Sequence, residues 1–176
     1  MTDKWYVMRT IPGKEEDAVS LLNRKIDYHL WMKCQILWKQ QLFRVKGEYL
    51  VSRKKMFPGY VFIKTECSGK LREMLRRSRE FPQLVESGRE ELVAVEQEDL
   101  RFLQSICGRE LEHDMGLSTV EIDADGQVRN AEGALKEYVG RIRRQRLRHR
   151  YVTAEVELFN RREDVLFGIR VEGDPE

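Results

Sequence analysis

Helix-like spacing of apolar residues is confined to the first 107 residues of this 176-residue chain, and this division constrains the fold more than any other feature. Within that part, apolar side chains repeat on one helical face in the segments 15–28, 68–79 and 96–107. Strand-like runs separate these segments, at 4–11, 35–45, 48–52, 60–65 and 81–85. The alternation of strands and helices predicts an α/β or α+β unit.

The pattern changes after Cys107. The segment 108–118 shows no sustained period and contains two glycines, so it is interpreted as a linker. Only short strand-like runs follow, at 120–122, 139–144, 151–159 and 165–171. Several short strands in so few residues predict a small barrel. We therefore expect a two-domain α+β protein with a domain at 1–107, a linker at 108–118 and an all-β domain at 119–176.

The composition narrows the class of protein. An apolar content of 41% supports packed cores. Neither a run of 18 apolar residues nor the layout of a secretory signal is present, so we expect a cytoplasmic protein. The cysteines and histidines show neither CxxC nor metal-ligand spacing, which argues against a disulfide framework and a metal site; they are Cys34, Cys67, Cys107, His29, His113 and His149.

Catalytic signatures are also missing. The run Asp123-Ala124-Asp125-Gly126 resembles part of a calcium loop, but its glycine is fourth rather than sixth, so a polar hairpin turn is expected. The sequence has no phosphate-cradling glycine loop and no nucleophile elbow. We expect no cofactor and no enzymatic activity, and an enzyme with an unrecognised site is the most remote hypothesis.

A dense run of arginines, RIRRQRLRHR, occupies residues 141–150 in a chain whose net charge is only +2. Guanidinium groups this close repel one another unless acidic side chains or a polyanion neutralise them. Acidic residues follow at 155, 157, 163 and 164, so a salt-bridged barrel surface is one interpretation. We favour structured RNA, whose phosphates and distorted grooves accept forked donors. The candidate RNA-binding residues are Arg141, Arg143, Arg144, Arg146, Arg148, His149 and Arg150.

A second feature is an apolar elbow in the run KKMFPGYVFIKTE, residues 54–66. Phe57-Pro58-Gly59 leads directly into the strand-like residues 60–63. Strand alternation places Val61 and Ile63 on the face opposite Tyr60 and Phe62. These aromatic side chains are either ordinary core or part of a binding surface, and the pattern alone leaves both interpretations open.

Two pairs of segments resemble a known family. WYVMRTIPGKEEDA and KKMFPGYVFIKTE are similar to the N-terminal NGN domain of the NusG family of transcription elongation factors. GALKEYVGRI and YVTAEVELF are similar to the C-terminal KOW domain of that family. The resemblance implies an NGN-type α/β sandwich, with an antiparallel sheet flanked by helices, followed by a small all-β KOW/Tudor-like barrel. It also implies a monomer.

The resemblance implies a contact with RNA polymerase. In this family a hydrophobic depression of the N-terminal domain docks on the clamp coiled coil of the polymerase. Motif matching assigns this role to Trp5, Tyr6, Phe57, Pro58, Tyr60 and Phe62. A second contact, with polymerase or the nontemplate DNA strand, falls on Arg76, Arg77, Ser78 and Arg79, for which a solvated helix face is the alternative.

The KOW domain of the housekeeping members binds a ribosomal protein or a termination factor through a loop, and Tyr138 matches an aromatic residue of that loop. Gly133-Ala134-Leu135 departs from the usual glycine-proline start of the loop. The arginine run resembles that of LoaP-like specialised antiterminators. One hypothesis is therefore a polymerase-bound antiterminator that reads a hairpin of the nascent RNA. The alternative is a housekeeping-like factor whose KOW domain recruits a protein.

Overall fold

The computed structural model describes residues 4–26, 31, 33–85 and 92–175. Its N-terminal part is built on a four-stranded antiparallel sheet with the strand order β2-β5-β1-β6. The strands are β1 (Trp5–Arg9), β2 (Lys33–Gln35), β5 (Tyr60–Lys64) and β6 (Val93–Ala94). The central pair runs in register from Trp5 opposite Lys64 to Arg9 opposite Tyr60.

Two helices, α1 (Glu15–Lys25) and α2 (Ser68–Arg77), cover one face of this sheet. Val61 and Ile63 of β5 are fully buried beneath these helices, whereas Phe62 is buried in a separate core on the other face. The alternation expected from the sequence is confirmed, and the sheet is covered on both sides. Among the described residues, no helix has the length and apolar content needed to cross a membrane.

The strand predicted at 81–85 is wrong. Residues Phe81–Gln83 form a 3-10 turn, η2, and only Val85 makes an isolated bridge, to Thr10. Pro82 lies in the first turn of η2, where its missing N–H costs nothing. The hydroxyl of Ser78 accepts the N–H of Phe81 at 3.3 Å, which favours a turn over an extended chain.

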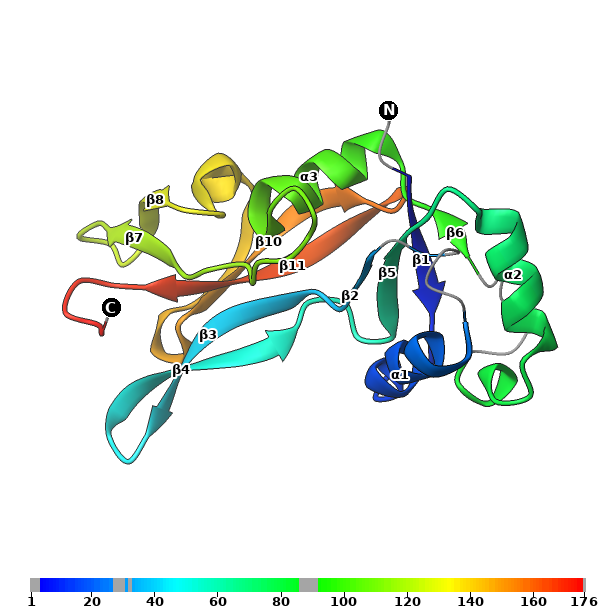
Figure 1. The fold of residues 1–176 in the computed structure, drawn as a ribbon. Coiled ribbons are helices and arrows are strands. Elements are labelled where there is room, and N and C mark those ends of the chain that lie inside the picture. Colours follow the sequence, from blue (N-terminus) through cyan, green and yellow to red (C-terminus); the bar gives the residue numbers. More distant parts are fainter. Residues whose placement is uncertain (1–3, 27–30, 32, 86–91, 176) are drawn as a thin grey trace.

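A long hairpin leaves the N-terminal sheet and lies along the C-terminal part (Figure 1). It consists of β3 (Trp38–Val45) and β4 (Glu48–Lys55), and its turn is at Lys46-Gly47, as expected. Both turn residues have positive φ, 51° and 86°, as a two-residue hairpin turn of this type requires. The hairpin therefore joins the two parts of the molecule.

The C-terminal part is a curled five-stranded sheet with the order β8-β7-β11-β10-β9. Its strands are β7 (Ser118–Ile122), β8 (Val128–Glu132), β9 (Ile142–Arg146), β10 (Tyr151–Leu158) and β11 (Arg161–Arg170). The side chain of Gln145 links the two edges, because it accepts the Val128 N–H at 3.2 Å and donates to the Gly126 carbonyl at 2.6 Å. The mixed α+β class with an all-β C-terminal part is confirmed.

Two details of the C-terminal part differ from the pattern. Strand β8 was not expected, and the run predicted as a strand at 139–144 begins inside a 3-10 helix, η3 (Lys136–Arg141). The polar turn expected at Asp123 is present, since its carboxylate accepts the N–H groups of Asp125 and Gln127, both at 2.9 Å. This turn connects β7 with β8.

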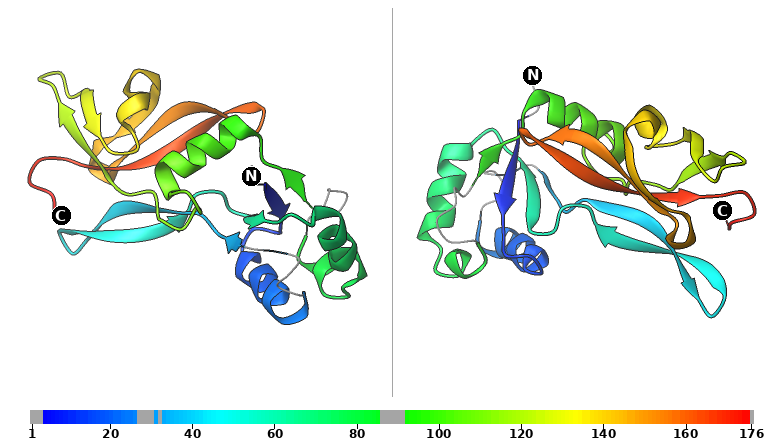
Figure 2. Two further views of the ribbon diagram at one scale, coloured as in Figure 1. Left: turned by 45° about the horizontal axis from the view of Figure 1, so that its top comes forward. Right: turned by 180° about the vertical axis from the view of Figure 1, so that it is seen from behind.

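One apolar core runs through both parts of the molecule. It contains Phe62 from the N-terminal sheet, Leu103 from the helix α3 (Gln97–Cys107) and Phe167 from β11. The segment 108–118 adds to this core, since Leu111 and Met115 are buried. Met115 exchanges backbone hydrogen bonds with β3, and the two halves are in close contact (Figure 2). The domain boundaries 1–107, 108–118 and 119–176 stay a prediction.

Candidate functional site

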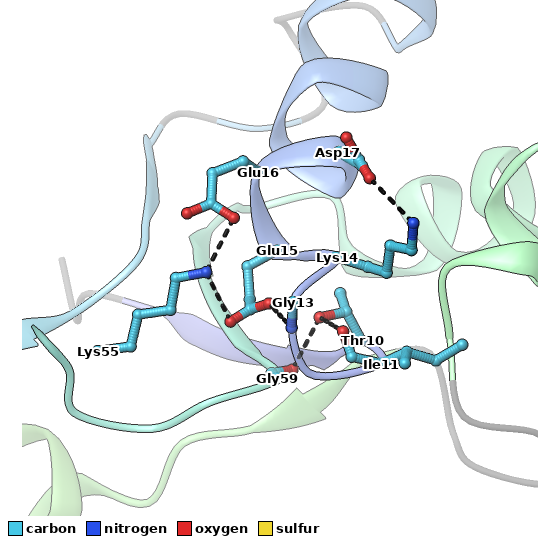
Figure 3. A network of polar contacts seen from close by, with 9 residues as sticks. All are labelled: Thr10, Ile11, Gly13, Lys14, Glu15, Glu16, Asp17, Lys55 and Gly59. Atoms are coloured by element: carbon cyan, nitrogen blue, oxygen red, sulfur yellow. Dashed lines mark hydrogen bonds and ion pairs between the residues drawn. The ribbon is translucent and has the colours of Figure 1, made fainter.

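The aromatic elbow is held in place by the turn that precedes α1 (Figure 3). Gly59 has a φ of 88°, and a Cβ at this position would lie 2.8 Å from the Thr10 carbonyl oxygen. The Thr10 N–H donates to the Gly59 carbonyl at 2.6 Å, and the Thr10 hydroxyl donates to the same oxygen at 3.1 Å. Only glycine fits this close backbone approach.

A buried ion pair supports the same elbow (Figure 3). Lys55 Nζ lies 3.0 Å from Glu15 Oε2 and 2.8 Å from Glu16 Oε2, and the side chain of Glu15 is fully buried. Burial raises the pKa of Glu15, but the hydrogen bond from Lys55, together with backbone N–H groups such as that of Gly13, lowers it below its usual value. The elbow is thus tied to the start of α1.

The aromatic side chains of the elbow form a cluster that is completed by a residue far away in the sequence. The ring of Phe57 lies 6.0 Å from the rings of both Tyr60 and Phe62. Phe159 packs against all three, with centroid distances of 5.6 Å to Phe57, 5.5 Å to Tyr60 and 6.3 Å to Phe62. Phe57 and Tyr60 remain half-buried, so the cluster lies at the surface and Phe159 covers part of it.

Phe159 sits at the tip of the turn between β10 and β11. Phe159 and Asn160 have φ values of 56° and 61°, a conformation that is unusual for a bulky aromatic residue. The Phe159 N–H donates to Asp99 Oδ2 at 3.1 Å, and Arg161 donates to the Tyr60 hydroxyl at 3.3 Å. Burial raises the pKa of Asp99, against the opposing effect of the Phe159 N–H. These contacts fasten the tip to the N-terminal part.

The other residues predicted for polymerase binding are placed differently. Trp5 is buried in the same core as Phe62, with 2% of its surface exposed. Tyr6 packs on the opposite face, near α2, with Arg72 5.9 Å from its ring. Pro58 is exposed. The structure thus brings Phe57 and Tyr60 together over Phe62, and it separates Tyr6 from them.

The second predicted contact lies at the end of α2. Arg76, Arg77 and Arg79 are exposed, and Arg77 forms an ion pair with Glu73 at 2.5 Å. This end of the molecule lies far from the C-terminal sheet (Figure 1). The three arginines form an exposed basic corner beside the half-buried Ser78, and the role of the four residues stays a prediction.

The arginine run divides into two groups, and the first is engaged in structural contacts. Arg150 donates to both carboxylate oxygens of Asp174, at 2.6 and 3.0 Å, and its guanidinium lies 4.3 Å from the Tyr49 ring. Arg143 forms an ion pair with Glu155. For Arg143 and Arg150 these contacts favour the salt-bridged surface, and their role in RNA binding stays a prediction.

The second group is free of such contacts. Within the described part of the chain, these residues are exposed and form no ion pair: Arg141, Arg144, Arg146, Arg148 and His149. They lie on η3, on β9 and on the short 3-10 turn η4 (Leu147–His149). Four uncompensated guanidinium groups and an imidazole on adjacent elements form a surface to which a polyanion is attracted.

Tyr138, the residue matched to the partner-binding loop, is half-buried. Its ring stacks on Phe167 with centroids 5.8 Å apart and meets Phe102 of α3 edge-on at 5.6 Å. Burial raises the pKa of its hydroxyl. Tyr138 therefore contributes to the contact between α3 and the C-terminal sheet. Phe159 contributes in the same way to the contact between the C-terminal sheet and the elbow.

The described residues contain no group of three or more His, Cys, Asp or Glu side chains that could hold a metal ion. Burial raises the pKa of the Cys34 and Cys107 thiols to about 12, so both stay protonated at neutral pH.

Sequence reasoning missed Phe159. Its signal was present, since Phe159 falls on the face of the strand-like run 151–159 that also carries Tyr151, Thr153, Glu155 and Glu157. An aromatic residue that follows these polar positions beside a turn indicates a partner surface. The pattern could not identify that surface, because it lies about 100 residues away in the sequence.

Comparisons with known proteins agree with this architecture. A family model described as transcription termination factor NusG matches residues 3–104. A solved structure of NusG from Thermotoga maritima, which describes a domain interaction, is similar over 96% of this chain and 94% of that one. The two sequences are 21% identical and the TM-score is 0.57. A search of curated proteins finds no match.

Proposed function

Because the chain belongs to the NusG family of transcription factors, whose members bind RNA polymerase, we propose that it is an elongation and antitermination factor. The half-buried rings of Phe57 and Tyr60, supported from below by the buried ring of Phe62, dock on the clamp coiled coil of the polymerase. The exposed arginines of the C-terminal part bind structured nascent RNA. The observation that carries this proposal is the half-buried cluster on its rigid support, because preordered aromatic anchors dominate protein interfaces.

Docking on this cluster requires a conformational change, because the free protein covers part of the cluster with Phe159. Phe159 occupies the position beside Phe57 and Tyr60 that a helical partner would take. The polymerase therefore binds a form in which the tip of the β10–β11 turn has left the elbow. The apparent affinity then equals the affinity of the open form multiplied by the fraction of molecules that are open, so a mostly closed protein binds weakly.

Residues 76–79, whose three arginines are exposed, supply a second contact on the other side of the polymerase cleft or on nontemplate DNA. A factor that touches both sides opposes opening of the clamp and shifts the polymerase population away from the paused state.

The direct test of the function is transcription in vitro through a terminator, on templates with and without the upstream leader of a target operon. We expect the protein to increase read-through only on the template with the leader. An equal increase in read-through on both templates would contradict recognition of the leader RNA. No increase in read-through on either template would contradict antitermination.

RNA binding is tested on the full-length protein with a hairpin from that leader. We expect the double variant Arg144→Ala/Arg146→Ala to bind at least tenfold more weakly, because each lost phosphate contact weakens binding and reduces the salt slope by about 0.7 to 0.9. The control Arg101→Ala/Arg109→Ala removes the same charge from α3 and the turn that follows it, where both side chains are exposed and form no ion pair among the described residues. Equal losses in both variants would show that only net charge matters.

The alternative function is recruitment of a termination factor or ribosomal protein by the C-terminal part. Tyr138 favours it, since its contact with Phe102 of α3 is one that a protein partner could replace when the two parts separate. Retention of such a protein, but not of the leader RNA, by the full-length chain would favour this alternative.

A further inference from the structure

A cavity of about 670 Å³ lies between the β3–β4 hairpin and the C-terminal sheet. One wall consists of hairpin residues such as Lys39, Phe43 and Lys54, and the other includes Arg148 and Tyr151. Its volume is in the range of small-molecule sites. Space on the order of one nucleotide is available there, and a base-paired helix is too wide to enter.

The lining of this cavity is cationic. Lys39, Arg44, Lys54 and Arg148 contribute to it together with His149, and none of its lining residues is acidic. Within the described residues, none of these five side chains takes part in an ion pair. This distinguishes them from neighbours such as Lys55, whose charge is neutralised by glutamates.

Of these five cations, Lys39 is the least exposed to solvent, and the other four side chains are exposed. Lys39 is half-buried, and burial together with the nearby charge of Lys54 lowers its pKa. An anion in the cavity would offset both effects, because it supplies the opposite charge that the protein lacks there. The hairpin thus presents a charge that is incompletely solvated and has no protein partner.

The cavity also has flat apolar walls. Phe43 lies on one side, with Lys54 Nζ 4.7 Å from its ring, and Tyr151 lies on the other, with the His149 ring 6.5 Å away. Aromatic faces beside cations are the combination that binds an unpaired base and its phosphate.

Two hydrogen bonds from the hairpin hold the η4 wall of the cavity in place. The Tyr49 hydroxyl donates to the Arg148 carbonyl at 3.2 Å, and Gln41 donates to the His149 carbonyl at 3.4 Å. Both bonds use the backbone of η4, so the guanidinium and the imidazole remain available. The site is therefore held in shape by the fold before any ligand arrives.

We propose that this cavity binds one unpaired nucleotide, with the phosphate on Lys39, Lys54 and Arg148 and the base against the aromatic walls. The inference rests on the RNA binding proposed above and deepens it, because it adds a single-stranded nucleotide to the hairpin bound at Arg144 and Arg146. Since the two walls come from different halves of the chain, binding stabilises the arrangement in which they lie together.

The test uses two probes. One is a labelled oligoadenylate of about ten nucleotides, a length within the site sizes of single-strand binders. The other is adenosine triphosphate. Phe43→Ala and Lys54→Gln are each expected to weaken binding about tenfold. Lys54 is exposed, so its variant keeps the fold. Lys70→Gln, an exposed charge on α2, is the control and should bind as the wild type does.

The outcomes separate the two proposals. Variant-sensitive binding of the oligonucleotide alone identifies RNA as the source of the nucleotide, and variant-sensitive binding of the triphosphate identifies a free nucleotide. Equal affinity in all variants, or no binding of either probe, overturns the cavity proposal. The leader hairpin and the Arg144→Ala/Arg146→Ala variant test the proposed function independently, because neither substitution lines the cavity.

Discussion

At the scale of single residues, ion pairing divides the cationic side chains into two groups: those that stabilise the fold and those that are free to bind an anionic partner. Arg150 and Lys55 are each bonded to carboxylates and lie largely within the fold, with 15% and 19% of their side chains exposed. Arg144 and Arg146 are exposed and unpaired among the described residues. The sequence could identify the arginine run but not this division, because the partner Asp174 lies 24 residues further along the chain.

The Lys55–Glu15 pair predicts a pH-dependent stability. Because the pKa of Glu15 in the folded protein lies below its usual 4.5, the pair stabilises the fold above that pH and loses its effect as the pH falls through the lowered value. We expect Lys55→Gln to lower the free energy of unfolding by about 3 kcal/mol at pH 7, because it leaves a buried carboxylate unpaired.

Urea unfolding from pH 7 to pH 4 checks this expectation. The difference between wild type and Lys55→Gln should shrink on acidification, since protonation removes the unpaired charge of Glu15. Lys54→Gln, at the exposed neighbouring position, should change stability by less than about 0.5 kcal/mol. A difference that stays constant over this pH range would contradict the role assigned to the pair.

At the scale of elements, strands and helices with a clear period could be predicted, and the hairpin turn at Lys46-Gly47 was found in its expected place. The errors have local causes. Pro82 and the Ser78 hydroxyl convert a strand-like run into a 3-10 turn. The segment 108–118 has no period because its buried residues, Leu111 and Met115, pack singly against other elements.

The contact between β3 and β11 depends on one glycine. A Cβ at Gly168 would overlap the Gln40 carbonyl oxygen and approach Leu117 to 3.0 Å. We expect Gly168→Ala to push the hairpin from the C-terminal sheet and to destabilise the protein by about 2 kcal/mol, a fall in Tm of about 4–8 °C.

Thermal unfolding followed by circular dichroism measures this shift. Gly140→Ala is the matched control, because no atom lies within 4 Å of the added Cβ and its φ is not in the left-handed region. If both variants had the same Tm as the wild type, the close packing of the hairpin on β11 would not contribute to stability.

At the scale of the whole molecule, two of the surfaces expected to bind partners, the elbow and Tyr138, face the other half of the chain. The elbow contacts Phe159, and Tyr138 contacts Phe102 of α3. The family and the two-part architecture could be inferred from sequence, but this mutual covering could not, because it depends on how the two parts pack. The free protein thus holds the two proposed binding surfaces against the other half of the chain, and we propose that partners compete with these internal contacts.

The most direct measurement is the affinity of the full-length protein for an isolated clamp coiled coil of RNA polymerase, compared between wild type and Phe159→Asn. Asparagine accepts the positive φ of the turn, so the variant keeps the hairpin while it loses the ring contacts with the elbow. Several aromatic contacts of about 0.5–1.5 kcal/mol each are removed, so we expect binding at least tenfold tighter, with Phe57→Ala weakening it. A folded Phe159→Asn protein that binds the coiled coil no more tightly than the wild type would contradict the proposal that Phe159 covers the polymerase-binding site.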